Sequence, residues 1–225
     1  DLIAQVSISE EDWIVPTYPL GAPEKNPMFF KNESYQGASR HYYPYFLQDN
    51  FTTEKIDQAW KALLLENEYI KICVTPEIGG KIYYGTDKTN GYHFLYKNDV
   101  VKPANIGMTG AWVSGGIEWN DLHHHRASSF LPVDYELQEN EDGSKTVWVG
   151  ETELRHRMRW TIGLTVFPGK SYVQAKIRIH NPTPYTHSLL YWANVAVHTN
   201  ENYQVIFPPS VQAVTYHAKR DFSHW

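Results

Sequence analysis

Cysteine is almost absent from the sequence: Cys73 is the only one among 225 residues. A single cysteine excludes an internal disulfide, and its place in the strand-like segment YIKICV predicts a small buried hydrophobe. An apolar run of about 20 residues is also absent, so we expect no membrane span. The first segment, DLIAQVSISEEDW, has no basic start followed by an apolar block, so no signal peptide is visible. A cytoplasmic location and a processed periplasmic form both stay open.

Clustered positive charge is missing as well. The formal net charge is -5, and the longest basic grouping is the histidine-mixed RHRMR at residues 155–159. Nucleic-acid binding draws most of its affinity from clustered lysine and arginine, so we expect no nucleic-acid partner. The sequence also has no GxSxG, Walker-type or strand-following GxGxxG motif, which argues against a nucleophilic serine, a phosphate loop and a dinucleotide site. We expect no cofactor.

Aromatic residues, in contrast, are abundant, with 8 Trp and 16 Tyr. Such amphipathic rings commonly line binding clefts, because each offers an apolar face and a polar handle. Sugars suit clefts of this kind, since the C–H face of a pyranose packs on a ring while its hydroxyls need hydrogen-bond partners. Aromatic-rich strands that pack on one another are the alternative interpretation.

The chain divides into an N-terminal arm and one main domain. Residues 1–50 carry many of the prolines and tyrosines without a sustained helix or strand period, which predicts an extended arm that packs on the main domain at 51–225. The segment TTEKIDQAWKALLLENEY at 52–69 predicts the one substantial helix, although a short one. Thr52 or Thr53 would cap it, and its apolar face would hold Ile56, Trp60, Leu63 and Leu64.

After Glu68 the hydrophobic period changes to two. The alternation is strongest at residues 158–166, where one face carries Met158, Trp160, Ile162, Leu164 and Val166. Residues 173–179 repeat the pattern between the turn segments PGKS and NPTP. Strands of this length, joined by short turns with few helices between them, predict an all-β antiparallel sandwich.

The segment SLLYWANVAVH at 188–198 predicts the floor of a site. Alternation gives it an apolar row of Leu189, Tyr191, Ala193, Val195 and Val197. The opposite face then carries Trp192, Asn194 and His198. An indole, an amide and an imidazole on one sheet face are typical of a polar binding surface.

The segment GGIEWNDLHHHRASSF at 115–130 concentrates chemistry in a few residues. A metal site is one interpretation, but neighbouring strand residues point to opposite faces, so at most His123 and His125 could share an ion without distortion. An acid/base site is another, because imidazoles titrate near neutral pH and a carboxylate such as Glu118 can be tuned toward that range. A loop organised by an ion pair of Glu118 with Arg126 or a histidine is the third.

Several segments in order resemble a known family: IVPTYPLGAPEKNPMF, LENEYIKICVTPEIGGKIYYG, GGIEWN, TVWVGETELRHRMRWTIGLTVFPGKSYV and NPTPYTHSLLYWANVAVHTNENYQVIFPPS. They resemble an uncharacterised bacterial family, often joined to tetratricopeptide repeats, whose main domain is similar to the galactose mutarotase superfamily. The resemblance implies an antiparallel β-supersandwich with a carbohydrate site. It places His123 loosely where a sugar-contacting histidine of aldose epimerases falls.

The chain departs from that superfamily at two points. Trp192 and Ala193 stand where a second histidine would be, which counts against mutarotase activity itself. The chain also stops at AKRDFSHW, before the further strands that the superfamily's sandwich has, one of which carries a base glutamate. We therefore expect an N-terminal portion of the sandwich that lacks part of the active site, with exposed sheet edges or the arm favouring a homodimer.

These observations favour a carbohydrate-active domain that uses acid/base chemistry, of the glycoside hydrolase or sugar epimerase kind. Its expected proton-transfer residues are Glu118, His124 and His125. Its expected sugar-binding residues are Trp119, Asn120, His123, Arg126, Trp192, Asn194 and His198. A non-catalytic glycan-recognition or scaffold domain is the second hypothesis, and a metal-dependent enzyme that uses the histidine triplet is the third; the first two need no metal.

Overall fold

The computed structural model describes residues 5–25, 34–35, 38–39, 43–121 and 124–214. Within these residues the only helical element is the short 3-10 turn η1 (Pro76–Ile78), and no helix has the length and hydrophobicity that crossing a membrane requires. The strands are β1 (Ser7–Thr17), β2 (Ser34–Tyr35), β3 (Ala38–Ser39), β4 (Ile56–Glu66), β5 (Ile70–Thr75), β6 (Lys81–Asp87), β7 (Tyr92–His93), β8 (Ala104–Gly107), β9 (Gly110–Trp112), β10 (Ile117–Asn120), β11 (Asp134–Glu139), β12 (Lys145–Thr152), β13 (Arg159–Val166), β14 (Val173–His180) and β15 (Trp192–Val195).

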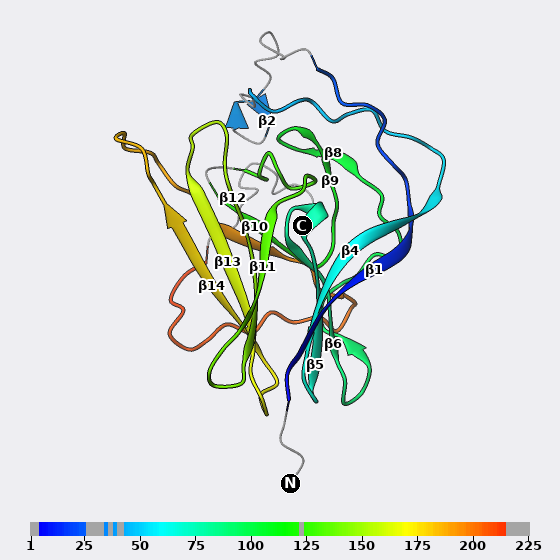
Figure 1. Cartoon of the computed structure of the whole chain (residues 1–225), viewed down its shortest axis with the longest axis vertical. Helices are drawn as coiled ribbons and strands as arrows, with labels where there is room; N and C mark the ends of the chain where they lie inside the picture. The colour runs from blue at the N-terminus through cyan, green and yellow to red at the C-terminus, as the bar shows by residue number, and fades with distance from the viewer. Residues whose placement is uncertain (1–4, 26–33, 36–37, 40–42, 122–123, 215–225) are drawn as a thin grey trace.

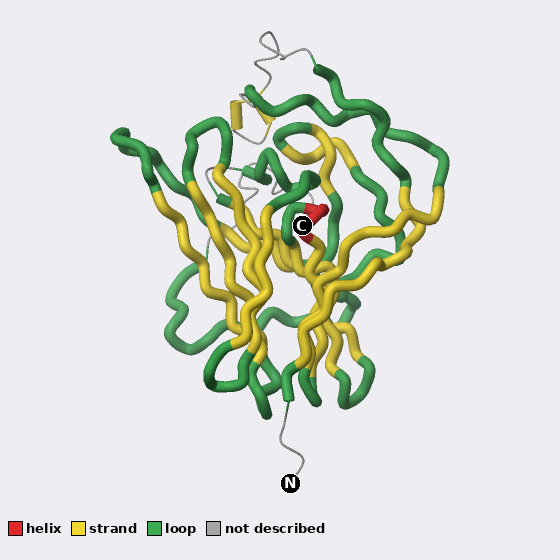
Figure 2. The backbone as a smooth tube through the Cα atoms, in the orientation of Figure 1, coloured by secondary structure: helices red, strands yellow, loops and turns green. Residues whose placement is uncertain are grey.

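Two antiparallel sheets form the body of the molecule. The larger has the order β1-β4-β5-β6-β10-β15 with β7 paired to β6, and the smaller has the order β11-β12-β13-β14. Figure 1 shows the two sheets as separate layers, with β11 to β14 on the left and β1, β4, β5 and β6 on the right. Figure 2 shows that long loops join the strand ends at the top of the same view. The prediction of an all-β antiparallel sandwich is confirmed.

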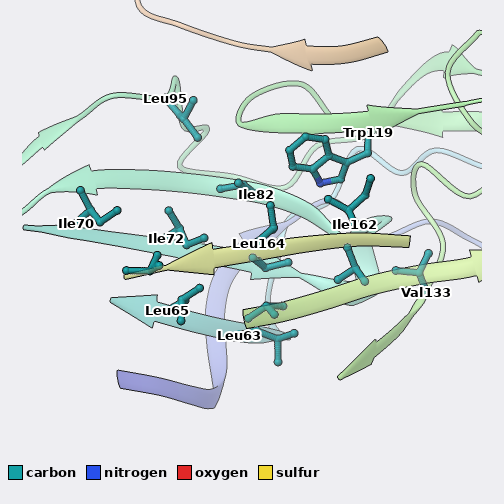
Figure 3. Packing of buried hydrophobic residues seen from close by; sticks show 14 of the residues in the cluster. Leu63, Leu65, Ile70, Ile72, Ile82, Leu95, Trp119, Val133, Ile162 and Leu164 are labelled. Atoms are coloured by element: carbon teal, nitrogen blue, oxygen red, sulfur yellow. The ribbon is translucent and has the colours of Figure 1, made fainter. Parts of the chain in front are cut away.

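The main core lies between these two layers. Leu63, Leu65 and Ile72 of the larger sheet pack against Ile162 and Leu164 of the smaller one, and each is at most 1% exposed (Figure 3). The alternating face predicted at residues 158–166 is buried throughout. Because burial of apolar side chains is the main favourable contribution to folding, this strict alternation fixes which side of β13 faces inward.

The helix predicted at residues 52–69 is wrong, because these residues contain the strand β4. A spacing of four residues, as between Ile56, Trp60 and Leu64, keeps side chains on one face both in a helix and in a strand. Tertiary pairing decides between the two: β4 pairs along its whole length with β1 and at residues 63–66 with β5. Leu63 then faces the main core, while Leu64 packs on the other side with Cys73.

The N-terminal arm contains a regular strand that the sequence did not predict. Residues 7–17 pair with β4 from Ser7 opposite Glu66 to Thr17 opposite Ile56. The acidic triplet Glu10, Glu11 and Asp12 interrupts the apolar pattern of this strand, and Trp13 and Val15 reach the side of the sheet away from the main core. Part of the arm is therefore a strand of the larger sheet; the division at residue 50 stays a prediction.

Within the described part of the chain, one side of the sandwich is open. The inward row of β14 and the predicted apolar row at 189–197 are partly exposed, with Ile177 at 37%, Leu189 at 50% and Val195 at 49%. Among the described strands, β14 pairs with β13 and β15 with β10, so each lies at the edge of its sheet. Of the predicted strand at 188–198, only Trp192–Val195 has strand structure.

Candidate functional site

The site is built around β10, whose residues alternate between the core and the opposite face of the sheet. Trp119 packs into the main core, where Figure 3 shows its indole beside Ile162. Glu118 therefore points the other way. The antiparallel register sets Glu118 opposite Asn194 and Asn120 opposite Trp192. Sheet pairing thus brings together two segments about 75 residues apart, each of which the sequence had marked as part of a site.

Glu118 lies at the centre of a cluster of hydrogen-bond donors. Its carboxylate accepts from Trp112 Nε1 at 3.0 Å, from His125 Nδ1 at 2.9 and 3.1 Å, and from Asn194 Nδ2 at 3.3 Å. The residue is only 4% exposed. A buried carboxylate requires such partners, because removing an unpaired charge from water is costly.

These contacts keep Glu118 ionised. Burial is the largest single influence and raises its pKa, but the hydrogen bond and charge of His125, the hydrogen bond from Trp112 and the charge of Lys81 together lower the pKa by more. The pKa of Glu118 falls to about 2. Glu118 is therefore an anion at neutral pH and not a proton donor.

Lys81 supplies a positive charge behind the carboxylate. It is 3% exposed, and its Nζ donates to the carbonyl oxygen of Val113 at 2.9 Å. Burial lowers the pKa of Lys81 to about 8, and the charge of Glu118 opposes this shift. The lysine ties the segment after Trp112 to β6.

His125 is held between two indoles. Its ring centroid lies 5.2 Å from that of Trp112 and 5.0 Å from that of Trp192, both edge to face. Because an ionised carboxylate only accepts hydrogen bonds, Nδ1 carries the hydrogen that faces Glu118. No described residue hydrogen-bonds Nε2, so this nitrogen can exchange a proton or a hydrogen bond with a ligand. Trp112, which is partly exposed, was missed by the sequence interpretation; its closeness to Gly115 and Glu118 along the chain was the available signal.

Two glycines lie directly before β10, and the second of them allows β10 to approach β6. Gly115 and Gly116 have φ values of 91° and 63°, in the region that favours glycine. A Cβ on Gly116 would collide with the carbonyl oxygen of Ile82. The missing side chain at Gly116 therefore permits a close backbone approach to the neighbouring strand.

Arg126 cross-links the loop and does not point toward the cluster's centre. Its Nε donates to the Trp119 carbonyl at 2.5 Å and one terminal nitrogen donates to the Gly79 carbonyl at 2.6 Å. Its guanidinium lies 4.1 Å from the ring centroid of Trp160. The ionic partner of Arg126 is Glu151, at 3.4 Å, whereas Glu118 pairs with a histidine.

The remaining predicted residues are distributed around this cluster. His124 adopts a left-handed backbone, with φ 58°, and its ring centroid is 5.0 Å from that of His125. Asn120 is fully buried, and its side-chain oxygen accepts from the Arg126 backbone at 3.2 Å. His198 lies apart from Glu118, beside two tyrosines. His123 lies outside the described residues.

The described residues hold no group of three His, Cys, Asp or Glu side chains placed to bind a metal ion. This statement does not extend to His123, which lies outside the described residues.

Asp121 is a second buried carboxylate that the sequence interpretation did not single out. It is 3% exposed, and neither oxygen has a hydrogen-bond partner among the described residues. Burial raises the pKa of Asp121 to about 6; the charge of Arg126 opposes the rise, and the charges of Glu151 and Glu153 add to it.

Comparison with known proteins gives a family and a structural neighbour. A family profile described as a domain of unknown function (DUF5107) matches residues 38–225. A crystal structure of a TPR-domain containing protein from Parabacteroides distasonis is similar over 87% of this chain, with a TM-score of 0.75 and 25% sequence identity. The matched region spans 32% of that protein, so the chain corresponds to about a third of its neighbour's length.

Proposed function

We propose that this chain, which belongs to the DUF5107 family, a domain of unknown function, binds a sugar at the cluster around Glu118 and His125. The observation that carries the proposal is an imidazole fixed by a buried carboxylate between two partly exposed indoles. The resemblance of the sequence to the galactose mutarotase superfamily supports the same ligand class.

Each part of the cluster suits a pyranose. The indoles of Trp112 and Trp192 offer apolar surface to the C–H face of the ring. His125 Nε2 and the side-chain oxygen of Asn194 offer polar contacts for hydroxyl groups. The carboxylate of Glu118 already accepts hydrogen bonds from three protein side chains, so we assign it the role of orienting His125.

The same geometry gives His125 the capacity for proton transfer. A carboxylate that accepts from Nδ1 fixes the tautomer, stabilises the imidazolium and leaves Nε2 to take a proton from a hydroxyl group and return it. In this proposal His125 is the acid/base residue and Glu118 is the positioning residue. His124, which contacts His125 edge to face, supports the ring from one side.

A non-catalytic glycan-recognition domain is the second candidate. It is favoured by the low pKa of Glu118, because a permanently ionised carboxylate cannot act as a second proton-transfer group beside His125.

Substitution of His125 and Glu118 distinguishes an acid/base enzyme from a non-catalytic recognition domain. We expect His125→Gln and Glu118→Gln to reduce turnover about 100-fold or more, because each removes or misorients the proton-transfer group. Trp192→Ala should instead weaken binding. Binding would be measured by calorimetry with D-glucose, D-galactose, D-mannose and D-xylose, and turnover by NMR exchange of the anomers and by hydrolysis of their aryl glycosides.

Tyr172→Ala is the matched control, because this exposed tyrosine lies between β13 and β14 and packs only beside Phe167 among the described ring contacts. Sugar binding without turnover in the unsubstituted protein would exclude the enzyme and support the glycan-recognition domain. Absence of binding to any sugar of the panel, or equal binding by Trp192→Ala, would refute the sugar site.

A further inference from the structure

A second group of aromatic side chains lies beyond the far end of β15. The ring of His198 lies 5.5 Å from that of Tyr96 and 6.0 Å from that of Tyr92, measured between centroids. Tyr92 and Tyr96 are 55% and 41% exposed. We call Tyr92, Tyr96 and His198 the second aromatic group. Two exposed phenol rings and an imidazole thus gather at one place, and amphipathic rings of this kind commonly line binding surfaces.

Backbone hydrogen bonds join this group to the sheet that carries Glu118. Ala196 N donates to the Gly116 carbonyl at 2.9 Å, Tyr96 N donates to the Ala196 carbonyl at 2.9 Å, and Gly116 N donates to the Tyr96 carbonyl at 2.8 Å. Three segments therefore meet at Ala196. The second aromatic group and the Glu118 cluster are held by one continuous backbone framework.

The segment from Trp192 to His198 forms a path between the two groups. Strand alternation in β15 sets Trp192 and Asn194 on the side of Glu118, Ala196 continues the pairing with Gly116, and His198 follows two residues later. The four residue steps from Trp192 to Ala196, at about 3.3 Å each, already span about 13 Å. The path carries small or polar side chains between its two aromatic ends. One pyranose ring is too short to contact both ends at once, whereas a linear chain of several rings could.

We propose that the second aromatic group is a further sugar subsite, so that the ligand is a linear oligosaccharide and not a free monosaccharide. This inference rests on the sugar site proposed for the Glu118 cluster. One unit of the chain would pack on Trp112 and Trp192, and a later unit would pack on Tyr92 and Tyr96. The phenol and imidazole groups carry polar atoms without a carboxylate, which suits neutral sugar units.

Chain length is the variable that tests the inference. The unsubstituted protein would be titrated by calorimetry with D-glucose, D-galactose, D-mannose, D-xylose and their linear oligosaccharides of increasing length. We expect the dissociation constant of the recognised series to fall about tenfold or more once the chain reaches the second aromatic group. The double substitution of Tyr92→Ala with Tyr96→Ala should abolish this gain and leave monosaccharide binding unchanged.

The controls separate this inference from the proposed function. Trp192→Ala should weaken binding at every length, and Tyr172→Ala should change nothing. Because both tyrosines of the subsite are exposed, thermal unfolding should show that the double variant remains folded. Affinity that does not depend on chain length, or a gain that survives in the double variant, overturns the subsite while the Glu118 site stands. Absence of binding at every length overturns both.

Discussion

Glu118 and Asp121 are three positions apart, and their pKa values shift in opposite directions although both side chains are buried. Both are at most 4% exposed. Glu118 meets three donor side chains and has a pKa near 2, whereas Asp121 has no described hydrogen-bond partner and has a pKa near 6. Burial raises the pKa of both groups, so the donors around Glu118 account for the difference.

Asp121 should therefore destabilise the protein as pH rises. Its folded pKa of about 6 lies above the ordinary value of 3.8, so the folded state binds more protons in this interval. The corresponding stability is present below pH 3.8 and is lost as pH rises through about 6. Asp121→Asn should stabilise the protein by on the order of 2 kcal/mol at pH 8 and by little at pH 4.

Urea unfolding at the two pH values measures this effect. Asp99→Asn is the control, because that side chain is 91% exposed and its surface ion pair contributes little. An equal change in unfolding free energy at pH 4 and pH 8 would show that Asp121 is paired or neutral throughout.

Among the elements, the contact of β10 with β6 depends on one glycine. Gly116 and Gly91 both have positive φ, at 63° and 75°, but a Cβ on Gly116 would strike the Ile82 carbonyl, while one on Gly91 would meet nothing within 4 Å. Gly91→Ala should cost about 1 kcal/mol from backbone strain alone. Gly116→Ala should cost several times more, because β10 must also move away from β6.

Urea unfolding of the two variants gives both values side by side. Similar losses would mean that backbone strain, and not the close approach of β10 to β6, determines the cost at Gly116.

For the whole molecule, the open side of the sandwich should favour self-association. β14 and β15 lie at sheet edges, and Ala175 on the inward face of β14 is exposed. Free strand edges beside apolar surface pair readily, and lysine blocks such pairing. Sedimentation should show concentration-dependent association that Ala175→Lys reduces more than Gln174→Lys, which sets the same charge on the outer face. A monomer at all concentrations would contradict this expectation.

The sequence predicted the strand at Trp160, Ile162 and Leu164, where alternation was strict, because a one-residue slip would expose the whole face. At 188–198, where the alternation was also regular, only Trp192–Val195 is a strand. The prediction failed at residues 56–66, where a spacing of four fits both helix and strand. The site was predicted in part: Glu118, His125, Trp192 and Asn194 do meet. Trp119 faces the main core, and Arg126 bonds to the distant Gly79 carbonyl. Local sequence does not specify which sheet face a side chain takes or which distant residue it contacts, so neither placement could be predicted.

Indole NMR signals most directly test the claim that a sugar binds at Glu118 and His125. The site and the core both contain tryptophan, so a buried indole serves as the internal reference. In protein labelled with ¹⁵N, the Nε1–H signals would be assigned with Trp→Phe variants and followed during titration with the sugar panel. We predict that a bound sugar shifts the signals of Trp112 and Trp192, while that of Trp160, which is 2% exposed in the core, stays in place. Signals of Trp112 and Trp192 that remain still across the whole panel, or that move no more than that of Trp160, would contradict a sugar site at Glu118 and His125.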